Sequence, residues 1–347
     1  MTDSSREAQF QKLFPAQPAF RFRQAWPALF NPAIDGWLEV SVWPKAMREI
    51  CGRDIPWTSL TPVKILTNQK RDTFKAALQT TDGKLIETVL MNNQRGHLTV
   101  CLSAQIGCSI GCRFCATGTL GQIRNLSADE IIDQFRFWQK YVFSELNNAG
   151  LISNVVLMGM GEPLLNYENV KTALIGLLAH TDLGETRVTV STVGIFPMLD
   201  NLLLDSQWPN VRLAISLHAP DYATRKKIIP TTPPDFFPKL TAWAKKYLAA
   251  FGNRRHHLSL EYILINDFND SIDQAKSLAK LAKTIGAVKI NLIPCNAAGR
   301  GEFQPSLPAH ARAFQNTLNA AGIIATVRQS MGSDIAAACG QLVAKMK

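Results

Sequence analysis

Three closely spaced cysteines are the part of this 347-residue sequence best suited to chemistry. Cys108, Cys112 and Cys115 follow the pattern C-x3-C-x2-C. Thiolates are soft ligands that favour zinc, copper(I) and iron–sulfur clusters. A structural zinc site usually has four protein ligands, and neither a second C-x2-C nor a nearby histidine pair accompanies this triplet. The spacing therefore favours a [4Fe–4S] cluster whose fourth iron is left open for a substrate or cofactor.

The segments around and after the triplet resemble one family of enzymes. The last cysteine follows an aromatic residue, Phe114, as in the radical S-adenosylmethionine (SAM) enzymes. From about residue 15 to the C-terminus the chain resembles the RNA adenine methyltransferases, through the segments CLSAQIGC, CRFCATG, NLSADEI, VLMGMGEPLLN, VTVSTVG, ISLHAP, NLIP and GSDIAAACGQL. That family contains adenine-C2 enzymes acting on 23S rRNA and tRNA, and related adenine-C8 enzymes that confer antibiotic resistance.

The resemblance implies two cofactors, a [4Fe–4S] cluster on the cysteine triplet and S-adenosyl-L-methionine. The SAM contacts that it implies are Gly161, Glu162, Ser191, Ser216, Leu217, His218 and Asn296. Glycine lets a backbone approach a ligand closely, and the carboxylate of Glu162 can bind an ammonium group or a ribose hydroxyl. Without the resemblance, the segment around Gly161 is equally well explained as a simple turn, and His218 as a core histidine.

The resemblance also assigns roles to Cys339, Cys101 and Glu87. The family residue matching Cys339 is methylated by one SAM, and a radical made from a second SAM removes hydrogen from that methyl group. The carbon radical adds to adenine, whose electrophilic ring carbons do not accept a methyl cation. The Cys101 match then attacks the sulfur and leaves a disulfide, and Glu87 matches the proton acceptor. From the sequence alone, Cys339 is a small buried side chain and Glu87 an exposed strand residue.

Composition and charge suggest where the protein works and what it binds. The formal net charge of +10 and the pI of about 9.3 favour a polyanion such as RNA. The N-terminal sequence lacks the apolar region of a signal peptide, and no apolar run approaches the roughly 18 residues of a membrane span. We therefore expect a cytoplasmic protein without a membrane partner. An electron donor such as flavodoxin and a monomeric state complete the expectation.

The N-terminal part of the chain, residues 1–60, is expected to be a small helical domain that contacts RNA, as the resemblance implies. Residues 1–12 are expected to be disordered, with prolines punctuating short helices over 13–53. Five residues could form a small core: Trp26, Phe30, Trp37, Val42 and Trp43. Five basic residues could face RNA, or be an ordinary solvated surface: Arg21, Arg23, Lys45, Arg48 and Arg53.

Residues 61–93 are expected to connect this domain to the rest as a β-hairpin, because two alternating runs are joined by Thr81, Asp82 and Gly83. Strands are then expected at 97–102, 154–158, 187–192, 211–217, 258–264 and 288–293, with a short one possible at 323–328. Helices alternate with them; one begins with a capping box at Ser127 and buries Ile131, Phe135, Trp138 and Val142, and others cover 271–286 and 309–321.

This alternation predicts an α/β protein, a barrel or part of one. The resemblance implies that residues 94–347 form a partial (β/α)6 radical SAM barrel that is open on one side. Functional side chains are expected beyond the C-terminal ends of the strands. The cysteine triplet and the later motifs occupy such positions.

Three segments depart from the family pattern, at 230–234, 296–299 and 328–332. They leave the RNA target and the modified carbon open. The main hypothesis is a methyltransferase acting on adenine C2 of 23S rRNA, with tRNA as a second candidate substrate. The alternatives are a C8 methyltransferase that confers antibiotic resistance, and an RNA-binding factor whose cluster is only structural.

Overall fold

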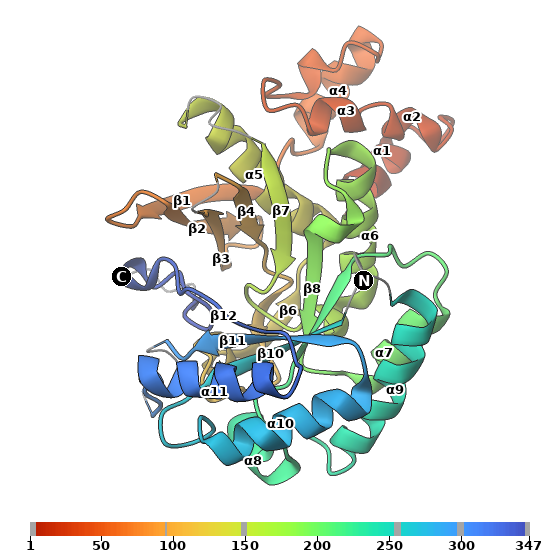
Figure 1. Ribbon diagram of the computed structural model, residues 1–347. Helices are drawn as coiled ribbons and strands as arrows, with labels where there is room; N and C mark the ends of the chain where they lie inside the picture. The colour runs from red at the N-terminus through yellow and green to blue at the C-terminus, as the bar shows by residue number, and fades with distance from the viewer. Residues whose placement is uncertain (1–4, 94–95, 147–150, 253–257, 297–301, 344–347) are drawn as a thin grey trace.

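The computed structural model describes residues 5–93, 96–146, 151–252, 258–296 and 302–343. Its main feature is one ten-stranded sheet with the order β1-β2-β3-β4-β7-β8-β9-β10-β11-β12. Neighbours from β1 to β4 are antiparallel, and neighbours from β4 to β12 are parallel. The curved parallel part is the predicted partial barrel, which stays open because β1 and β12 are the two edges of the sheet (Figure 1).

All six strands expected in the barrel are present, and the short strand expected near residue 325 joins them as a seventh parallel strand. The barrel strands are β4 (Leu98–Cys101), β7 (Ile152–Leu157), β8 (Val188–Thr192), β9 (Arg212–Ser216), β10 (Leu258–Leu264), β11 (Val288–Pro294) and β12 (Ala325–Val327).

Helices cover the outer face of the barrel (Figure 1). They are α5 (Ala128–Ser144), α6 (Tyr167–His180), α7 (Phe196–Leu204), α8 (Tyr222–Ile228), α9 (Phe236–Phe251), α10 (Ile272–Ile285) and α11 (Pro308–Ala320). The predicted capping box at Ser127 is confirmed, and Ser271 forms a second one at the start of α10. No helix in the described ranges is both long and apolar enough to span a membrane.

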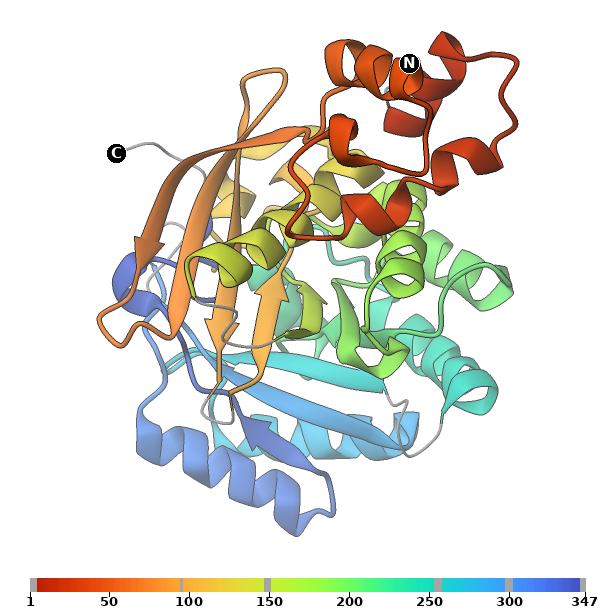
Figure 2. The ribbon, with the colours of Figure 1, turned by 90° about the horizontal axis from the view of Figure 1, so that it is seen from above.

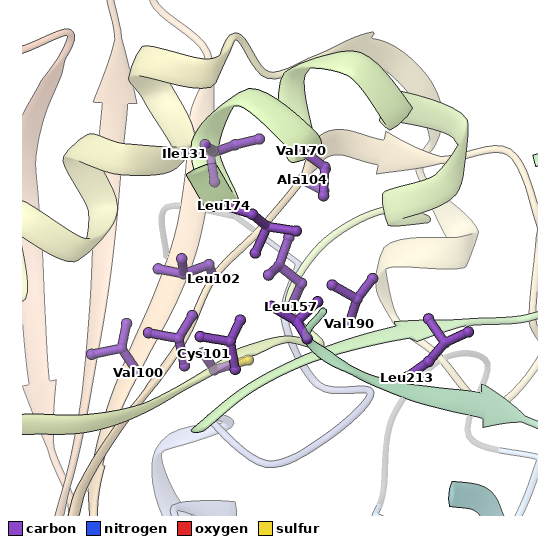
Figure 3. Close-up of a cluster of buried hydrophobic side chains, with 14 of the residues drawn as sticks. Val100, Cys101, Leu102, Ala104, Ile131, Leu157, Val170, Leu174, Val190 and Leu213 are labelled. Carbon is purple, nitrogen blue, oxygen red and sulfur yellow. The ribbon is translucent and has the colours of Figure 1, made fainter. Parts of the chain in front are cut away.

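The core lies between the sheet and these helices. Figure 3 shows Val100 and Leu102 of the first barrel segment and Leu157 of β7 grouped with Ile131 of α5 and Leu174 of α6. The apolar stripe predicted for α5 is buried, with exposures of 3% or less for Ile131, Phe135, Trp138 and Val142. Helix α5 therefore packs on the sheet through the face that the sequence indicates.

Side chains along each strand point alternately to the two faces of the sheet, so the inner face carries different residues from the helix-covered outer face. In β10, Leu260 and Tyr262 belong to the core under the helices, so Ser259, Glu261 and Ile263 point to the opposite side. Polar residues on the inner face are the ones available to a ligand inside the barrel.

The N-terminal helices form a group on one side of the barrel, next to α5 and α6 (Figure 2). They are α1 (Arg6–Leu13), α2 (Phe20–Arg23), α3 (Trp26–Leu29) and α4 (Lys45–Asp54). The expectation of disorder over residues 1–12 is wrong for 6–12, because the Arg6 side chain forms a buried ion pair with Asp133. Val42 is also not part of the aromatic core, since it is 59% exposed. Residues 1–4 lie outside the described ranges.

The predicted hairpin is present as β2 (Thr73–Thr80) and β3 (Leu85–Asn92), with Gly83 at φ +77° in the turn. A third strand, β1 (Leu60–Thr67), pairs with β2, and β3 pairs with β4. The hairpin therefore continues the barrel sheet. A small two-stranded sheet that the sequence did not reveal, β5 (Gln105–Cys108) with β6 (Gly121–Asn125), flanks the cysteine loop.

Candidate active site

The cysteine loop leaves the end of β5 and returns through β6. Gly107 has φ +74°, and a Cβ there would lie 1.8 Å from the carbonyl oxygen of Gly121, so the close approach of the two strands requires glycine. The loop is tied to helix α8, because the Arg113 amide donates to the Ile228 carbonyl at 2.9 Å. These contacts fix the loop that carries Cys108, Cys112 and Cys115.

The three thiols share a partly buried, apolar space. Burial raises the pKa of Cys108 to about 11 and also raises the pKa of Cys112, and the charge of Cys115 adds to both shifts. Cys108 and Cys112 pack against a cluster of buried side chains: Ile110, Ile228, Ile229, Ile263, Ile265 and Cys295. Apolar walls of this kind limit the access of water to a bound group.

The donor set of the loop fits a cluster. Cys108, Cys112 and Cys115 are all free thiols, and each keeps some exposed surface. Three soft thiolate donors at the edge of an apolar space therefore suit a [4Fe–4S] cluster held by Cys108, Cys112 and Cys115.

Gly161 and Glu162 follow β7 at the C-terminal end of the sheet. Gly161 has φ +94°, and a Cβ there would lie 2.4 Å from the Cβ of Gln105, so glycine is required. The Glu162 carboxylate is 3% exposed and accepts from the amides of Leu164 (3.0 Å) and Val193 (2.9 Å). Burial raises the pKa of Glu162. Gly161 and Glu162 thus place backbone groups and one oriented carboxylate close to the cysteine loop.

The polar residues expected after β8 and β9 come together. The hydroxyls of Ser191 and Ser216 are 3.2 Å apart. Leu217 is buried, and His218 has φ +61° and accepts from the amide of Ile263 through Nδ1 at 3.0 Å. Burial, with a smaller contribution from a nearby arginine, lowers the pKa of His218 to about 3, so its imidazole is neutral. The ring of Phe114 packs edge-on against it, with centroids 4.8 Å apart.

The C-terminal segment lies directly against the cysteine loop. Asn296 donates to the carbonyl of Cys339 at 3.1 Å, and the Ala116 amide donates to the carbonyl of Gly340 at 2.7 Å. A Cβ on Gly340 would lie 3.8 Å from the Cα of Cys115. The structure thus brings Cys339 next to the expected cluster site and to an expected SAM contact. Residues 297–299, in one of the segments that depart from the family pattern, lie outside the described ranges.

Cys101 lies at the end of β4 and is 8% exposed. Burial raises the pKa of its thiol to about 12, and the charge of nearby Cys339 adds to this shift. Cys339 keeps an exposed surface, but the surrounding protein still desolvates its thiol and raises its pKa. All seven cysteines are described and are free thiols, so the structure contains no Cys101–Cys339 disulfide.

Glu87 contacts the same C-terminal segment from strand β3. Its Oε1 pairs with Nζ of Lys75 at 3.0 Å, and its Oε2 accepts from the Val343 amide at 2.7 Å. Lys75 also donates to the Ala336 carbonyl at 3.1 Å. Glu87 is 4% exposed, so it is not the exposed strand residue that the sequence alone suggested. Its role as proton acceptor remains a prediction.

Comparisons with known proteins agree with this geometry. The model of the radical SAM superfamily matches residues 102–279. The dual-specificity RNA methyltransferase RlmN of Marinobacter nauticus is 37% identical, with 100% of this chain and 92% of the relative covered. A probable RlmN of Dictyoglomus thermophilum is 39% identical, with 94% and 91% covered. The chain belongs to the radical SAM RNA methyltransferase family.

A solved structure supports the same assignment. The crystal structure of a radical SAM methyltransferase from Sphaerobacter thermophilus matches with a TM-score of 0.87 and 35% identity, covering 99% of each chain. The family resemblance and the fold class expected from the sequence are therefore confirmed. As a member of this family the protein is an enzyme whose cofactors are a [4Fe–4S] cluster and SAM.

Three residues near the site of this radical SAM enzyme were not singled out from the sequence: Arg225, Glu261 and Lys75. Arg225 is 1% exposed, and its positive charge favours the thiolate of Cys112 against the effect of burial. Glu261 lies on the inner face of β10, and Lys75 pairs with Glu87. In the sequence, each of the three is a charged residue within a strand or an amphipathic helix. Such a position suggests that the charge has a partner, but it does not show which residue or ligand that partner is.

Proposed function

We propose that this enzyme methylates carbon 2 of an adenine in 23S rRNA, with tRNA as a second substrate, through an S-methyl group on Cys339. The observation that carries the proposal is the position of Cys339. Cys339 lies close to Cys101 and next to the cysteine loop. Its backbone carbonyl accepts a hydrogen bond from the side chain of Asn296. The names of the relatives, dual-specificity RNA methyltransferases, support RNA as the substrate.

The chain's own residues would divide the work as follows. Cys108, Cys112 and Cys115 would hold the cluster, which together with SAM would supply the organic radical that takes hydrogen from the methyl group on Cys339. The methylene carbon held by Cys339 would then bond to carbon 2 of adenine. The adduct would give up one electron, which the bound cluster can accept, and the proton of carbon 2, which Glu87 accepts. The Cys101 thiolate attacks the Cys339 sulfur, so a disulfide forms and the sulfur–carbon bond breaks. The electron pair stays on carbon, which becomes a methyl group on taking a proton.

RNA must present an exposed base to this site, because a ring carbon is inaccessible in a stacked helix. The net charge of +10 favours RNA binding. We assign residues 1–60 to RNA contact, 61–93 to a connector and 94–347 to the catalytic barrel. Basic residues of the first part would face RNA: Arg21, Arg23, Lys45, Arg48 and Arg53. A monomer in the cytoplasm, reduced by a donor such as flavodoxin, completes the proposal.

The test is methyl transfer from labelled SAM to deproteinised 23S rRNA by the anaerobically reconstituted enzyme. Digested nucleosides are compared with 2-methyladenosine and 8-methyladenosine by mass spectrometry. We expect label in 2-methyladenosine, and its complete loss in Cys339→Ala. Cys51→Ala is the matched control, since Cys51 is a free cysteine buried in helix α4, and it should keep the wild-type product.

Other outcomes separate the alternatives. Label in 8-methyladenosine would assign the enzyme to the adenine-C8 branch. An enzyme that binds RNA and a cluster but transfers no label would be a binding factor with a structural cluster. Repeating the assay with tRNA decides whether tRNA is a second substrate.

A further inference from the structure

A buried carboxylate that the mechanism above does not use lies on the inner face of the barrel. Glu261 of β10 is 3% exposed. Its Oε1 accepts from the hydroxyl of Ser259 at 3.0 Å and from the amide nitrogen of Asn291 at 2.7 Å. Its Oε2 is buried and has no hydrogen-bond partner among the described residues.

Such an atom requires an explanation. Nearly all buried polar atoms in folded proteins are hydrogen-bonded, because desolvating one without a partner costs free energy. Burial accordingly raises the pKa of Glu261, although the positive charge of Arg328 opposes this effect. An acceptor left without a partner at this cost, on the inner face of the barrel, is typical of a residue whose partner is a ligand.

The sheet register shows which ligand would reach this oxygen. Glu261 is paired with Ser216 on β9 and with Asn291 on β11. Ser216 contacts Ser191, so the expected SAM contacts are immediate neighbours of Glu261 on the inner face. Two residues further along the same face, Ile263 packs in the apolar cluster that includes Cys108 and Cys112.

Electrostatics place Glu261 near the methyl carrier as well. The carboxylate of Glu261 adds to the desolvation that raises the pKa of Cys339, and Arg328 opposes it. Glu261 therefore borders the space between the SAM contacts and Cys339. The open hydrogen-bonding position of Oε2 is that of an acceptor, so a partner for it would offer an N–H or O–H group.

Both ligands expected in this space contain adenosine, SAM as its nucleoside and RNA as the target nucleotide. We propose that Oε2 of Glu261 is an adenosine-binding atom that accepts a hydrogen bond from a ribose hydroxyl or the 6-amino group. Asn291 and Ser259 hold the other oxygen and so orient the free one. The inference rests on the proposed function, since that function brings both adenosines into the barrel.

The test is Glu261→Gln, which keeps an oxygen for Asn291 and Ser259 but replaces the free acceptor by an amide NH2 donor. We expect the melting temperature to stay or rise, because an unpaired buried carboxylate is removed. We expect at least a tenfold loss of affinity for one adenosine ligand. Equilibrium dialysis of the reconstituted enzyme against SAM without RNA measures the first arm. The KM for 23S rRNA, with methylation of Cys339 unchanged, measures the second.

Glu168→Gln is the matched control, because it makes the same change at a carboxylate that is 74% exposed and pairs with Lys171 on helix α6. Its SAM affinity and its KM for 23S rRNA should stay within about twofold of wild type. Weaker SAM binding by Glu261→Gln assigns the carboxylate to SAM, and a raised RNA KM alone assigns it to the target nucleotide. Unchanged values in both arms overturn the inference while the proposed function stands. Wild-type enzyme that binds no SAM would overturn both.

Discussion

Arg225 shows how one buried charge can organise several loops of the site. Its guanidinium stands 3.5 Å from the centre of the Phe236 ring, a cation–π contact. It donates to four acceptors at 2.7–2.9 Å: the carbonyls of Val193, Ser216 and Leu217 and the hydroxyl of Thr232. The first three follow or end the strands that carry Ser191 and Ser216. Thr232 belongs to a segment that departs from the family pattern, and here it completes this network.

Replacing Arg225 by Met should lower the free energy of unfolding by about 3–5 kcal/mol, because four buried acceptors lose their donor. Arg225→Lys should lose less, since it keeps the charge and up to three donors. Urea unfolding of the cluster-free protein measures both changes. Arg53→Met is the control, as Arg53 is exposed and pairs with its sequence neighbour Asp54 on the surface. Equal stability of wild type and Arg225→Met would show that the network contributes nothing.

At the scale of single residues, the sequence identified those site residues whose type and spacing alone indicate a function. The cysteine triplet needs only local spacing, and Cys101 and Cys339 were found through family motifs. Arg225 and Glu261 were missed because their meaning comes from partners elsewhere in the chain. Glu261, for example, is defined by Asn291 on the next strand and by an oxygen that has no described partner.

At the scale of elements, the C-terminal segment is held in place by strands that precede the barrel. The buried pair of Lys75 and Glu87 binds it at two points, the Ala336 carbonyl and the Val343 amide. On the other side, the Thr117 hydroxyl donates to the Leu342 carbonyl at 2.6 Å. The hairpin and the cysteine loop together therefore position Cys339.

Lys75→Met should loosen this segment. It leaves Glu87 buried without its cation, which costs about 3–5 kcal/mol, and it removes the bond to Ala336. We expect limited proteolysis to cut the chain after about residue 330 at least ten times faster than in wild type, as followed by mass spectrometry. Lys84→Met, in the exposed turn of the same hairpin, should leave the rate unchanged. Wild-type resistance in Lys75→Met would mean that the pair does not anchor the segment.

Elements with local signals were predicted well, and those that depend on distant contacts were not. The capping boxes at Ser127 and Ser271 mark helix starts within four residues of sequence. Helix α1 lacks an apolar pattern that would predict it from the sequence. It is held by Arg6, which contacts Asp129 and Asp133, more than 120 residues away in the chain. The pairing of β5 with β6 likewise depends on a loop closing between them.

At the scale of the whole molecule, a buried ion network joins the N-terminal helices to the barrel. Asp133 of α5 accepts from Arg6 at 2.8 and 2.9 Å and pairs with Arg136. It also accepts from the amide and hydroxyl of Ser59, both at 2.7 Å. Arg136 in turn donates to the carbonyl of Leu29 at 2.7 Å. The proposed RNA-contacting domain is thereby held in one orientation relative to the catalytic barrel.

This network should make the docking sensitive to acid. Burial alone would raise the pKa of Asp133, but the charges of Arg6 and Arg136 outweigh it and hold the pKa at about 2. A carboxyl with a depressed pKa stabilises the fold above its unfolded pKa near 4, here by about 2 kcal/mol, and loses this contribution as the pH falls from 4 towards 2. Asp133→Asn should therefore lower the unfolding free energy by about 3–5 kcal/mol at pH 7, with the difference from wild type shrinking below pH 4.

Urea unfolding between pH 2.5 and pH 7, followed by tryptophan fluorescence, measures this difference. The range covers most of the interval in which the Asp133 carboxylate loses its stabilising effect, because its pKa in the folded protein is about 2. Trp37 and Trp43 are buried in the N-terminal part, and Trp138 and Trp243 are buried in the barrel, so the signal reports on both parts of the molecule. Asp54→Asn is the control, because Asp54 pairs with Arg53 on the surface and should give wild-type curves at every pH. A constant difference between Asp133→Asn and wild type down to pH 2.5 would contradict the argument, because the stabilisation would then not depend on the ionised carboxylate. A difference that shrinks by about 2 kcal/mol as the carboxylate is protonated would show that one buried carboxylate couples the N-terminal helices to the barrel.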